Sequence, residues 1–367
     1  MKKHEIIFLN YENIVSKLRK EWKVMEEFKT IKDLVKFNTI KDKENKEIIN
    51  YIENYLLNLG FKTEYKSKNL IMKIGEKPKL GFLGHTDTVE YIDEFKNPFK
   101  LTEKGEYLFG LGSCDMKGGI AAMLDAVSKI DFNSLNYGMK LYFTYDEEIG
   151  FGGIYELVNN KEKFPEFMIF GEPTNNEVLT GEKGILEYKI YFNGIKAHSS
   201  NPEKGISANL NAVNFLYELE VFYKNSIKKD TENVFEIPYT TMNVGIINGG
   251  SAMNSIPAKC EVCMDFRIVN NNHKKLIKNK VEELGKKYNA EINIFEELDP
   301  FIDKIEFIKE IKTANFLTEA GVIGNCSKRI ILGVGPVTAH EVNENISKNS
   351  YRRLVKQYQD LIYNICE

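Results

Sequence analysis

Residues 139–148, MKLYFTYDEE, decide the fold class of this chain. A short, mainly apolar run of this kind is typical of a strand buried on both faces, and here it runs directly into three acids. Residues 167–170, FMIF, repeat the arrangement shortly before Glu172. In open α/β sheets ligands bind beyond the carboxyl ends of the strands. The acids therefore lie where chemistry usually takes place.

The sequence before this stretch alternates between strand and helix patterns. Residues 69–74 and 80–83 are short apolar runs that predict strands, whereas residues 44–59 and 117–130 have the apolar spacing of helices. An alternation of this kind is typical of βαβ units. We therefore expect an α/β domain.

The pattern changes near residue 181. The segments that follow predict, in chain order, strand 186–192, helix 206–223, strands 240–247 and 258–268, helix 274–288 and strand 291–295. This β-α-β-β-α-β order is that of a ferredoxin-like unit. After residue 300 the alternation of helix and strand resumes. We expect an α+β domain of residues 181–297 inserted into an α/β domain built from residues 1–180 and 298–367.

Composition excludes several classes of protein. With 43% apolar and 28% charged residues, the 367-residue chain is neither disordered nor collagen-like nor a coiled coil. Its 50 basic and 53 acidic residues nearly cancel and form no basic stripe, so nucleic acid is not an expected partner. The apolar run at residues 6–9 is too short for a signal peptide, and no stretch approaches a membrane span. We expect a cytoplasmic protein that does not bind membranes.

The five cysteines do not predict a disulfide framework. Their number is odd and they are scattered along a large chain. Cys260 and Cys263 form a C-x-x-C pair, but they lie in a segment with the alternation of a strand, where residues three apart point to opposite faces. We expect buried or half-buried thiols.

Three of the five histidines stand in polar motifs: His85 in GHTDT, His198 in AHSS and His340 in TAHE. Asp87 follows His85 by two residues, so on an extended segment the two side chains point the same way. Asp87 could then hydrogen-bond the far nitrogen of a metal-bound His85. A turn stabilised by an acid is the alternative interpretation.

Asp115 lies in a glycine-rich loop, residues 108–119, LFGLGSCDMKGG. The spacing of Gly110 and Gly112 resembles a dinucleotide-binding loop, but Asp115 takes the position of the third glycine, where a phosphate would meet a carboxylate. This excludes the nucleotide interpretation. A carboxylate in such a loop suits a ligand that bridges two cations.

Glu147 and Glu148 are adjacent acids at a strand end, where they repel each other unless a metal ion or a proton lies between them. Their side chains diverge, so one can bind a metal while the other acts as general base. A solvated acidic loop is the alternative.

The expected metal ligands of the whole chain are two histidines and three carboxylates: His85, His340, Asp115, Glu148 and Glu172. Nitrogen and oxygen donors suit zinc, cobalt or manganese, and a shared carboxylate suits two metals about 3.5–4 Å apart.

Taken together, these motifs resemble a known family. The matching segments are residues 84–89, 115–118, 146–148, 171–174, 197–205, 248–250, 265–267 and 339–344. In this order they resemble the co-catalytic metallopeptidases that include acetylornithine deacetylase, succinyl-diaminopimelate desuccinylase and glutamate carboxypeptidase. The resemblance covers nearly the whole chain. It implies a catalytic domain with a mixed sheet flanked by helices, and an inserted lid.

The resemblance also implies roles for the site residues. Asp115 would bridge two zinc ions, with His85 and Glu172 on one ion and Glu148 and His340 on the other. Glu147 would be the general base, and Asp87 would orient His85.

The inserted domain resembles the lid through which members of the family form homodimers. His198 would reach the active site of the partner subunit and stabilise the oxyanion. Arg267 and Asn254 would bind the α-carboxylate of an N-acyl amino acid, and the planar guanidinium of arginine suits this contact. For Arg267 a surface ion pair is the alternative.

Within the family, residues 97–102, 107–112, 237–245, 318–320 and 332–336 look most like the acetylornithine deacetylases. This implies removal of the acetyl group from N-acetyl-L-ornithine in arginine biosynthesis. The alternatives are a succinyl-diaminopimelate desuccinylase, a related deacylase or dipeptidase, and a metal-binding homologue without turnover. Glu319 could face the ornithine ammonium group or be an ordinary helix or loop acid. A serine hydrolase is excluded because the chain has no G-x-S-x-G motif.

Overall fold

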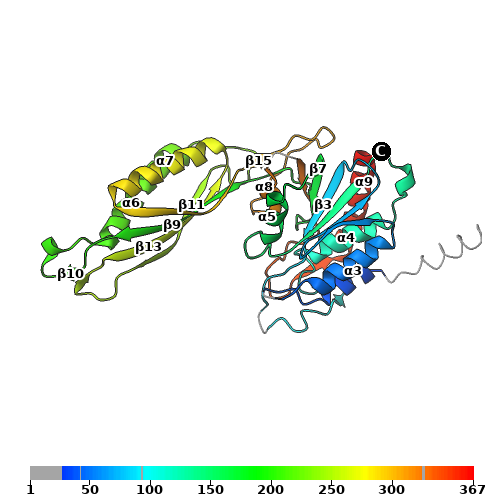
Figure 1. Ribbon diagram of the computed structural model, residues 1–367, viewed down its shortest axis with the longest axis horizontal. Helices are drawn as coiled ribbons and strands as arrows, with labels where there is room; N and C mark the ends of the chain where they lie inside the picture. The colour runs from blue at the N-terminus through cyan, green and yellow to red at the C-terminus, as the bar shows by residue number, and fades with distance from the viewer. Residues whose placement is uncertain (1–26, 42, 92–93, 325–326) are drawn as a thin grey trace, which may run out of the picture.

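The computed structural model describes residues 27–41, 43–91, 94–324 and 327–367. Figure 1 shows two domains side by side along the longest axis, a larger one that contains α3, β3 and α9 and a smaller one that contains α6, α7 and β13. We call the larger one the catalytic domain and the smaller one the lid. The apolar run at residues 6–9 and Cys326 lie outside the described residues.

The catalytic domain is built on a six-stranded mixed sheet. Its strands, in spatial order, are β1 (Lys62–Lys66), β2 (Leu70–Ile74), β6 (Met139–Thr144), β3 (Leu80–His85), β7 (Phe167–Phe170) and β16 (Lys328–Ile331). The last four are mutually parallel, whereas β2 is antiparallel to β6 and to β1. This arrangement confirms the predicted α/β class with a mixed sheet.

Helices cover both faces of this sheet, which explains why its strands are apolar on both sides. One face packs against α2 (Lys29–Val35), α3 (Lys46–Leu57), α4 (Lys117–Val127) and α9 (Lys348–Cys366), and the other against α5 (Gly152–Asn159) and α8 (Glu319–Val322). Neighbouring residues of β3 enter different cores, with Phe82 on the first face and Leu83 on the second. Both side chains are almost fully buried.

The lid has the ferredoxin-like order that the sequence predicts. Its elements are β9 (Gly184–Asn193), α6 (Ala208–Phe222), β11 (Thr241–Gly249), β13 (Lys259–Ile268), α7 (Asn271–Lys287) and β14 (Ala290–Leu298). The strands form an antiparallel sheet in the order β11-β13-β9-β14, and α6 and α7 share one core with it. The predicted domain limits, residues 181 and 297, stay a prediction.

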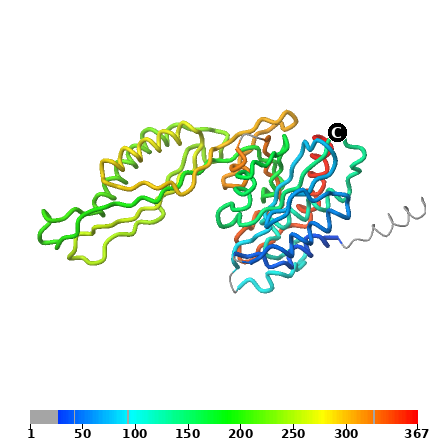
Figure 2. Tube along the Cα trace, in the orientation of Figure 1, coloured from blue at the N-terminus to red at the C-terminus, as the bar shows by residue number. Residues whose placement is uncertain are grey.

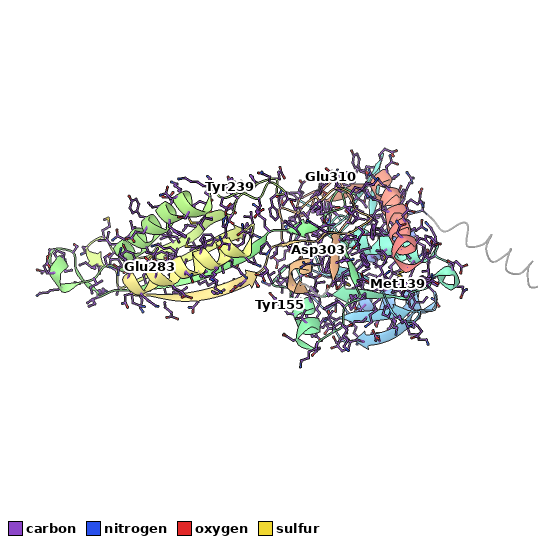
Figure 3. All side chains as sticks on the ribbon, turned by 90° about the horizontal axis from the view of Figure 1, so that it is seen from above. Met139, Tyr155, Tyr239, Glu283, Asp303 and Glu310 are labelled. Carbon is purple, nitrogen blue, oxygen red and sulfur yellow. The ribbon has the colours of Figure 1, made fainter. Side chains whose placement is uncertain are left out.

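The chain passes between the two domains twice, at neighbouring places (Figure 2). It enters the lid after β8 (Gly181–Glu182) and returns before β15 (Phe301–Ile302), and these two short strands pair with each other. Figure 3 shows Tyr155 and Asp303 at this junction, between Glu283 of the lid and Met139 of the catalytic domain. The Tyr155 hydroxyl donates to Glu296 of β14 at 2.7 Å, so α5 contacts the base of the lid.

The remaining elements are short. They are β4 (Thr102–Lys104), β5 (Tyr107–Phe109) and β17 (Asn345–Ser347), which form a three-stranded sheet; β10 (Ala197–His198) and β12 (Ser255–Ile256), which pair with each other; and the one-turn helices Phe132–Ser134, Pro202–Lys204 and Tyr223–Ile227. The four described cysteines are free, and Cys260 is buried where Cys263 is half-buried, as expected for alternate faces of β13. No helix in the described ranges is long and apolar enough to cross a membrane.

Candidate active site

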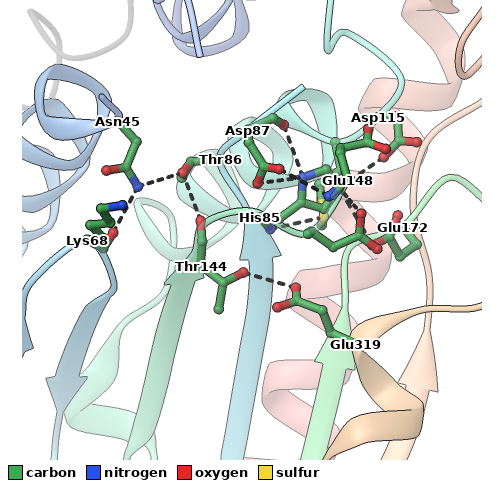
Figure 4. A network of polar contacts seen from close by, with 12 residues as sticks. Asn45, Lys68, His85, Thr86, Asp87, Asp115, Thr144, Glu148, Glu172 and Glu319 are labelled. Atoms are coloured by element: carbon green, nitrogen blue, oxygen red, sulfur yellow. Dashed lines mark hydrogen bonds and ion pairs between the residues drawn. The ribbon is translucent and has the colours of Figure 1, made fainter. Parts of the chain in front are cut away.

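Three neighbouring parallel strands end at one place on the edge of the catalytic sheet. His85 is the last residue of β3, Glu147 and Glu148 follow β6, and Glu172 follows β7. Because the carboxyl ends of parallel strands meet at the same edge, the pairing of β3 with both β6 and β7 brings these four side chains together. Figure 4 shows His85, Glu148 and Glu172 converging there.

Two loops complete the site. Asp115 stands just before α4, and His340 lies in the loop before β17. The Oδ1 atom of Asp115 lies 3.1 Å from Nε2 of His85, and its Oδ2 atom lies 3.6 Å from Nε2 of His340. Asp115 thus presents each of its carboxylate oxygens to a different histidine.

Each histidine has a further acid beside it. Nε2 of His85 lies 3.8 Å from Oε1 of Glu172, and Nε2 of His340 lies 3.2 Å from Oε2 of Glu148. The Oε2 atom of Glu147 is 4.0 Å from Nε2 of His85. We call these six residues, His85, Asp115, Glu147, Glu148, Glu172 and His340, the histidine–carboxylate cluster.

The electrostatics of the cluster favour a bound cation. Burial raises the pKa of Glu147 and of Glu172 well above the ordinary value, and neighbouring carboxylates raise it further. Burial alone would lower the pKa of His85, but the charge of Glu147 and the contact with Asp115 raise it well above the ordinary value. The cluster therefore attracts positive charge.

The donor set fits divalent metal ions. Two groups have ligand atoms within 4.8 Å of one another, namely His85 with Glu147 and Glu172, and His85 with Asp115 and Glu148. The Oε1 atom of Glu148 is buried and has no hydrogen-bond partner among the described residues, so it is free to bind a ligand. Imidazole and carboxylate donors without thiolate suit zinc, cobalt or manganese.

Asp87 contacts the cluster in two ways. Nδ1 of His85 lies 3.1 Å from the backbone carbonyl oxygen of Asp87 and 3.6 Å from its carboxylate. The other carboxylate oxygen accepts a hydrogen bond from the backbone N–H of Glu148 at 3.1 Å. The sequence predicted a hydrogen bond between the carboxylate and the ring, but the carboxylate Oδ1 has no hydrogen-bond partner among the described residues, and the ring faces the backbone carbonyl. The sequence did not predict the contact with the backbone carbonyl or the hydrogen bond from Glu148.

Glu319 is buried beneath the cluster's strands rather than exposed. It is the first residue of α8, has no exposed surface, and accepts a hydrogen bond from the hydroxyl of Thr144 at 3.0 Å (Figure 4). Burial raises its pKa to about 8. Of the two interpretations of Glu319, the structure shows a fully buried acid at the start of a helix, and a contact with an ornithine ammonium group stays untested.

The lid residues lie apart from the cluster. His198 is exposed in β10, at the end of the lid far from β3 (Figure 1), and its Nδ1 lies 2.7 Å from the Ser200 hydroxyl. Asn254 is beside it, since its carbonyl accepts from the N–H of Ser199. The structure thus brings His198 and Asn254 together, but it does not bring either to the cluster of its own chain.

Arg267 lies at the opposite end of the lid. It pairs across the sheet with Ile185 near the catalytic domain, and its guanidinium lies 3.1 Å from the carboxylate of Asp265. Strand β13 begins at Lys259 beside the far end of the lid, and eight residues of strand span about 25 Å. Within one chain, Arg267 and Asn254 therefore do not reach the same ligand.

Sequence reasoning assigned no role to Glu344, although it ends the motif at residues 339–344. Its carboxylate accepts hydrogen bonds from the loop that carries Asp115. The only available signal was the presence of an acid in a dense polar motif, because a contact with backbone N–H groups leaves no pattern in the sequence.

Comparison with known proteins agrees with this architecture. Residues 180–293 match the family model of the peptidase dimerisation domain. The chain is 32% identical to the acetylornithine deacetylase of Buchnera aphidicola subsp. Schizaphis graminum, an alignment that covers 94% of this chain and 97% of that one.

Solved structures share the fold. A tripeptidase from Staphylococcus aureus superposes with a TM-score of 0.74 at 20% identity, covering 92% of this chain and 96% of the other. A dinuclear metal binding peptidase of the M20 family from Bacillus subtilis superposes with a TM-score of 0.69 at 12% identity, with the same coverages. Fold, cluster and relatives define a metal-dependent hydrolase with an M20 peptidase architecture. Within that class, the chain belongs to the acetylornithine deacetylase family.

Proposed function

We propose that this protein is a two-metal amidohydrolase that removes the acetyl group from N-acetyl-L-ornithine and releases L-ornithine and acetate, a step of arginine biosynthesis. This proposal rests mainly on the position of Asp115 between His85 and His340, each of which has a further acid beside it. The substrate is inferred from the name of the Buchnera relative. Zinc is the proposed metal, with cobalt or manganese as substitutes, and a cytoplasmic location stays a prediction.

The proposed ligand assignment is the one that the family resemblance implies, and four of the distances support it. Asp115 would bridge two ions, with His85 and Glu172 on one and Glu148 and His340 on the other. Bound divalent cations supply two effects, a lowered pKa of water and a polarised amide carbonyl. The protein must then supply proton transfer, substrate orientation and stabilisation of the oxyanion.

Glu147 is the proposed general base and acid. Glu147 is the one residue of the histidine–carboxylate cluster that the proposed assignment does not use as a metal ligand. Its Oε2 atom lies 4.0 Å from Nε2 of His85. Burial raises its pKa well above the ordinary value, which suits a group that takes a proton from the attacking water and gives it to the leaving nitrogen. Asp87 orients His85 and the backbone of Glu148.

The lid offers a surface for a second copy of this chain. Four apolar residues form a stripe along the exposed side of α6: Leu210 (63% exposed), Val213 (58%), Tyr217 (66%) and Val221 (42%). Strand β11 is an edge of the lid sheet and exposes Ile246 and Ile247. An apolar helix stripe and an open strand edge are both features that a partner covers. We propose a homodimer formed through the lid, in keeping with the match to the dimerisation domain.

The dimer gives a role to the residues at the far end of the lid. His198 lies far from the cluster of its own chain, so the proposed oxyanion contact is made in the partner's site, and Asn254 accompanies it. Arg267, at the base of the lid, would bind the substrate α-carboxylate in its own chain after leaving Asp265. Each active site is then built from two chains.

The experiment is release of ornithine from N-acetyl-L-ornithine by protein stripped of metal, before and after zinc or cobalt is restored. We expect release only after restoration. N-succinyl-diaminopimelate and a dipeptide are tested in parallel. Release from one of these alone would keep the amidohydrolase and change the substrate. No hydrolysis of any of the three, with two metal ions bound, would favour the metal-binding homologue without turnover.

A further inference from the structure

The carboxylate of Glu344 is buried in the loop that presents Asp115. Its Oε2 atom accepts a hydrogen bond from the N–H of Gly112 at 2.7 Å, and its Oε1 atom accepts from the N–H groups of Cys114 at 2.7 Å and Asp115 at 2.9 Å. The residue is 2% exposed. Three backbone donors thus converge on the carboxyl group of one side chain.

Glu344 belongs to the same loop as His340. This loop is closed by Thr338, whose hydroxyl donates to the carbonyl of Asn345 at 2.7 Å and accepts from its N–H at 2.9 Å. The backbone carbonyl of Glu344 also accepts from the N–H of Gly110 at 3.1 Å. The loop of His340 is therefore fastened to the loop of Asp115 by both the side chain and the backbone of Glu344.

This connection matters because burial does not fix His340. Its side chain is 56% exposed and its backbone has a φ of +63°, in the left-handed region that favours glycine. The ring nevertheless lies within 3.6 Å of Asp115 and 3.2 Å of Glu148. Its position must then come from the segments that flank it, and Glu344 attaches them to the Asp115 loop by three side-chain hydrogen bonds.

We propose that Glu344 is a positioning residue, which holds the loops of Asp115 and His340 at one spacing so that the metal site shared by Asp115, Glu148 and His340 forms. The proposal rests on the two-metal function proposed above. It distinguishes the two ions: the site of His85 and Glu172 takes only Asp115 from the loops that Glu344 holds, whereas the site of His340 takes both Asp115 and His340 from them.

The test is cobalt binding by the full chain carrying Glu344→Gln. An amide nitrogen cannot accept a hydrogen bond, so at least one of the three backbone donors loses its partner. We expect the affinity for the second equivalent of Co²⁺ to fall about 10- to 100-fold and the affinity for the first to fall much less. Calorimetry gives the affinities, and the visible absorption of Co²⁺ reports the geometry of each equivalent.

The matched control is Glu341→Gln, an exposed acid in the same loop, which should leave both equivalents unchanged. A Glu344→Gln protein that binds both equivalents like the wild type would overturn the proposal. Equal weakening of both equivalents would overturn it too, because it would indicate a general structural role.

A second variant covers the case in which Glu344→Gln does not fold. Thr338→Val opens the His340 loop but leaves the three hydrogen bonds of Glu344 to the Asp115 loop in place, and it should also weaken mainly the second equivalent. Wild-type binding by this variant would count against the proposal. If the wild type itself binds fewer than two ions, the proposed function fails first, so the two failures are distinguishable.

Discussion

The Nε2 atom of His85 lies 3.1 Å from Oδ1 of Asp115, although the two residues are 30 positions apart in the sequence. The histidine ring is buried at the end of a strand, and its other nitrogen faces the carbonyl of Asp87. Asp115 comes from a loop and has a second oxygen directed at His340. The carboxylate of Asp115 therefore links the two histidines.

Replacing Asp115 by asparagine should remove this link. We expect Asp115→Asn to bind one metal ion or none in place of two, and to lose at least about 100-fold in kcat, because an amide nitrogen cannot coordinate the second cation. Elemental analysis of the dialysed protein and the ornithine assay measure the two quantities. Asp360→Asn, an exposed acid on α9, is the control. Two ions retained by Asp115→Asn would exclude a bridging role.

The adjacent acids Glu147 and Glu148 should separate catalysis from metal binding. Glu147→Gln should lower kcat about 10²- to 10⁴-fold with its metal content unchanged, the loss expected for a general base. Glu148→Gln should instead lose the ion at His340, whose ring lies 3.2 Å from Glu148. The two variants are each other's control. Loss of metal from Glu147→Gln would place Glu147 among the ligands, in line with its proximity to His85 and Glu172.

The parts of the site that the sequence predicts are those built by local structure. His85, Glu148 and Glu172 each stand at or just after an apolar strand, so recognising the strands and their parallel order is enough to place the three side chains together. The lid follows in the same way, because each of its strands and helices has a clear periodicity. Helix α5 escaped prediction, since it begins with two glycines and has only eight residues.

The parts that the sequence does not predict depend on contacts between distant segments. Gly112 and Glu344 are 232 positions apart and meet only because β17 pairs with β5. The separation of Asn254 from Arg267 is likewise a property of the folded lid, in which β13 sets them at opposite ends. The sequence motifs assign Asn254 and Arg267 a role by family resemblance, but they do not indicate how far apart the two side chains lie in the folded protein.

Mixed dimers should show whether the lid supplies a residue to the neighbouring site. Inactive His198→Ala and Glu147→Gln proteins are mixed, dissociated and reassociated. A mixed dimer then holds one site with an intact cluster and an intact His198 from the partner subunit, so activity should return to about a quarter of the wild-type level for random pairing. The unmixed variants are the controls. No recovery, with mixed dimers demonstrated, would place His198 in the site of its own chain.

The apolar stripe on α6 should control assembly. Tyr217→Asp sets a charge in the middle of the proposed interface, so we expect a monomer by light scattering and a loss of activity together with the dimer, because burying an unpaired charge opposes association. Lys275→Asp, an exposed residue of α7, should remain dimeric and active. A dimeric Tyr217→Asp protein would show that α6 does not form the interface.

The acid at the base of the lid should make stability depend on pH. Glu182 is fully buried in β8, where its Oε2 accepts from the hydroxyl of Thr318 at 2.8 Å, and burial raises its pKa from 4.5 to about 8. Between these values the folded protein holds a proton that the unfolded chain has lost. The contribution of Glu182 to the free energy of unfolding is therefore fully present below about pH 4.5. It falls by about 1.4 kcal/mol per pH unit between there and about pH 8.

Glu182→Gln stays neutral and should lose this dependence. Urea denaturation of the metal-free proteins gives the unfolding free energy of each. We expect the variant to become progressively more stable relative to the wild type from pH 5 to pH 8, and the difference to level off above pH 8. Glu203→Gln, at an exposed position of the lid, should show a constant difference near zero. A constant difference for Glu182→Gln as well would mean that Glu182 is ionised in the folded protein, and that the base of the lid holds a buried charge.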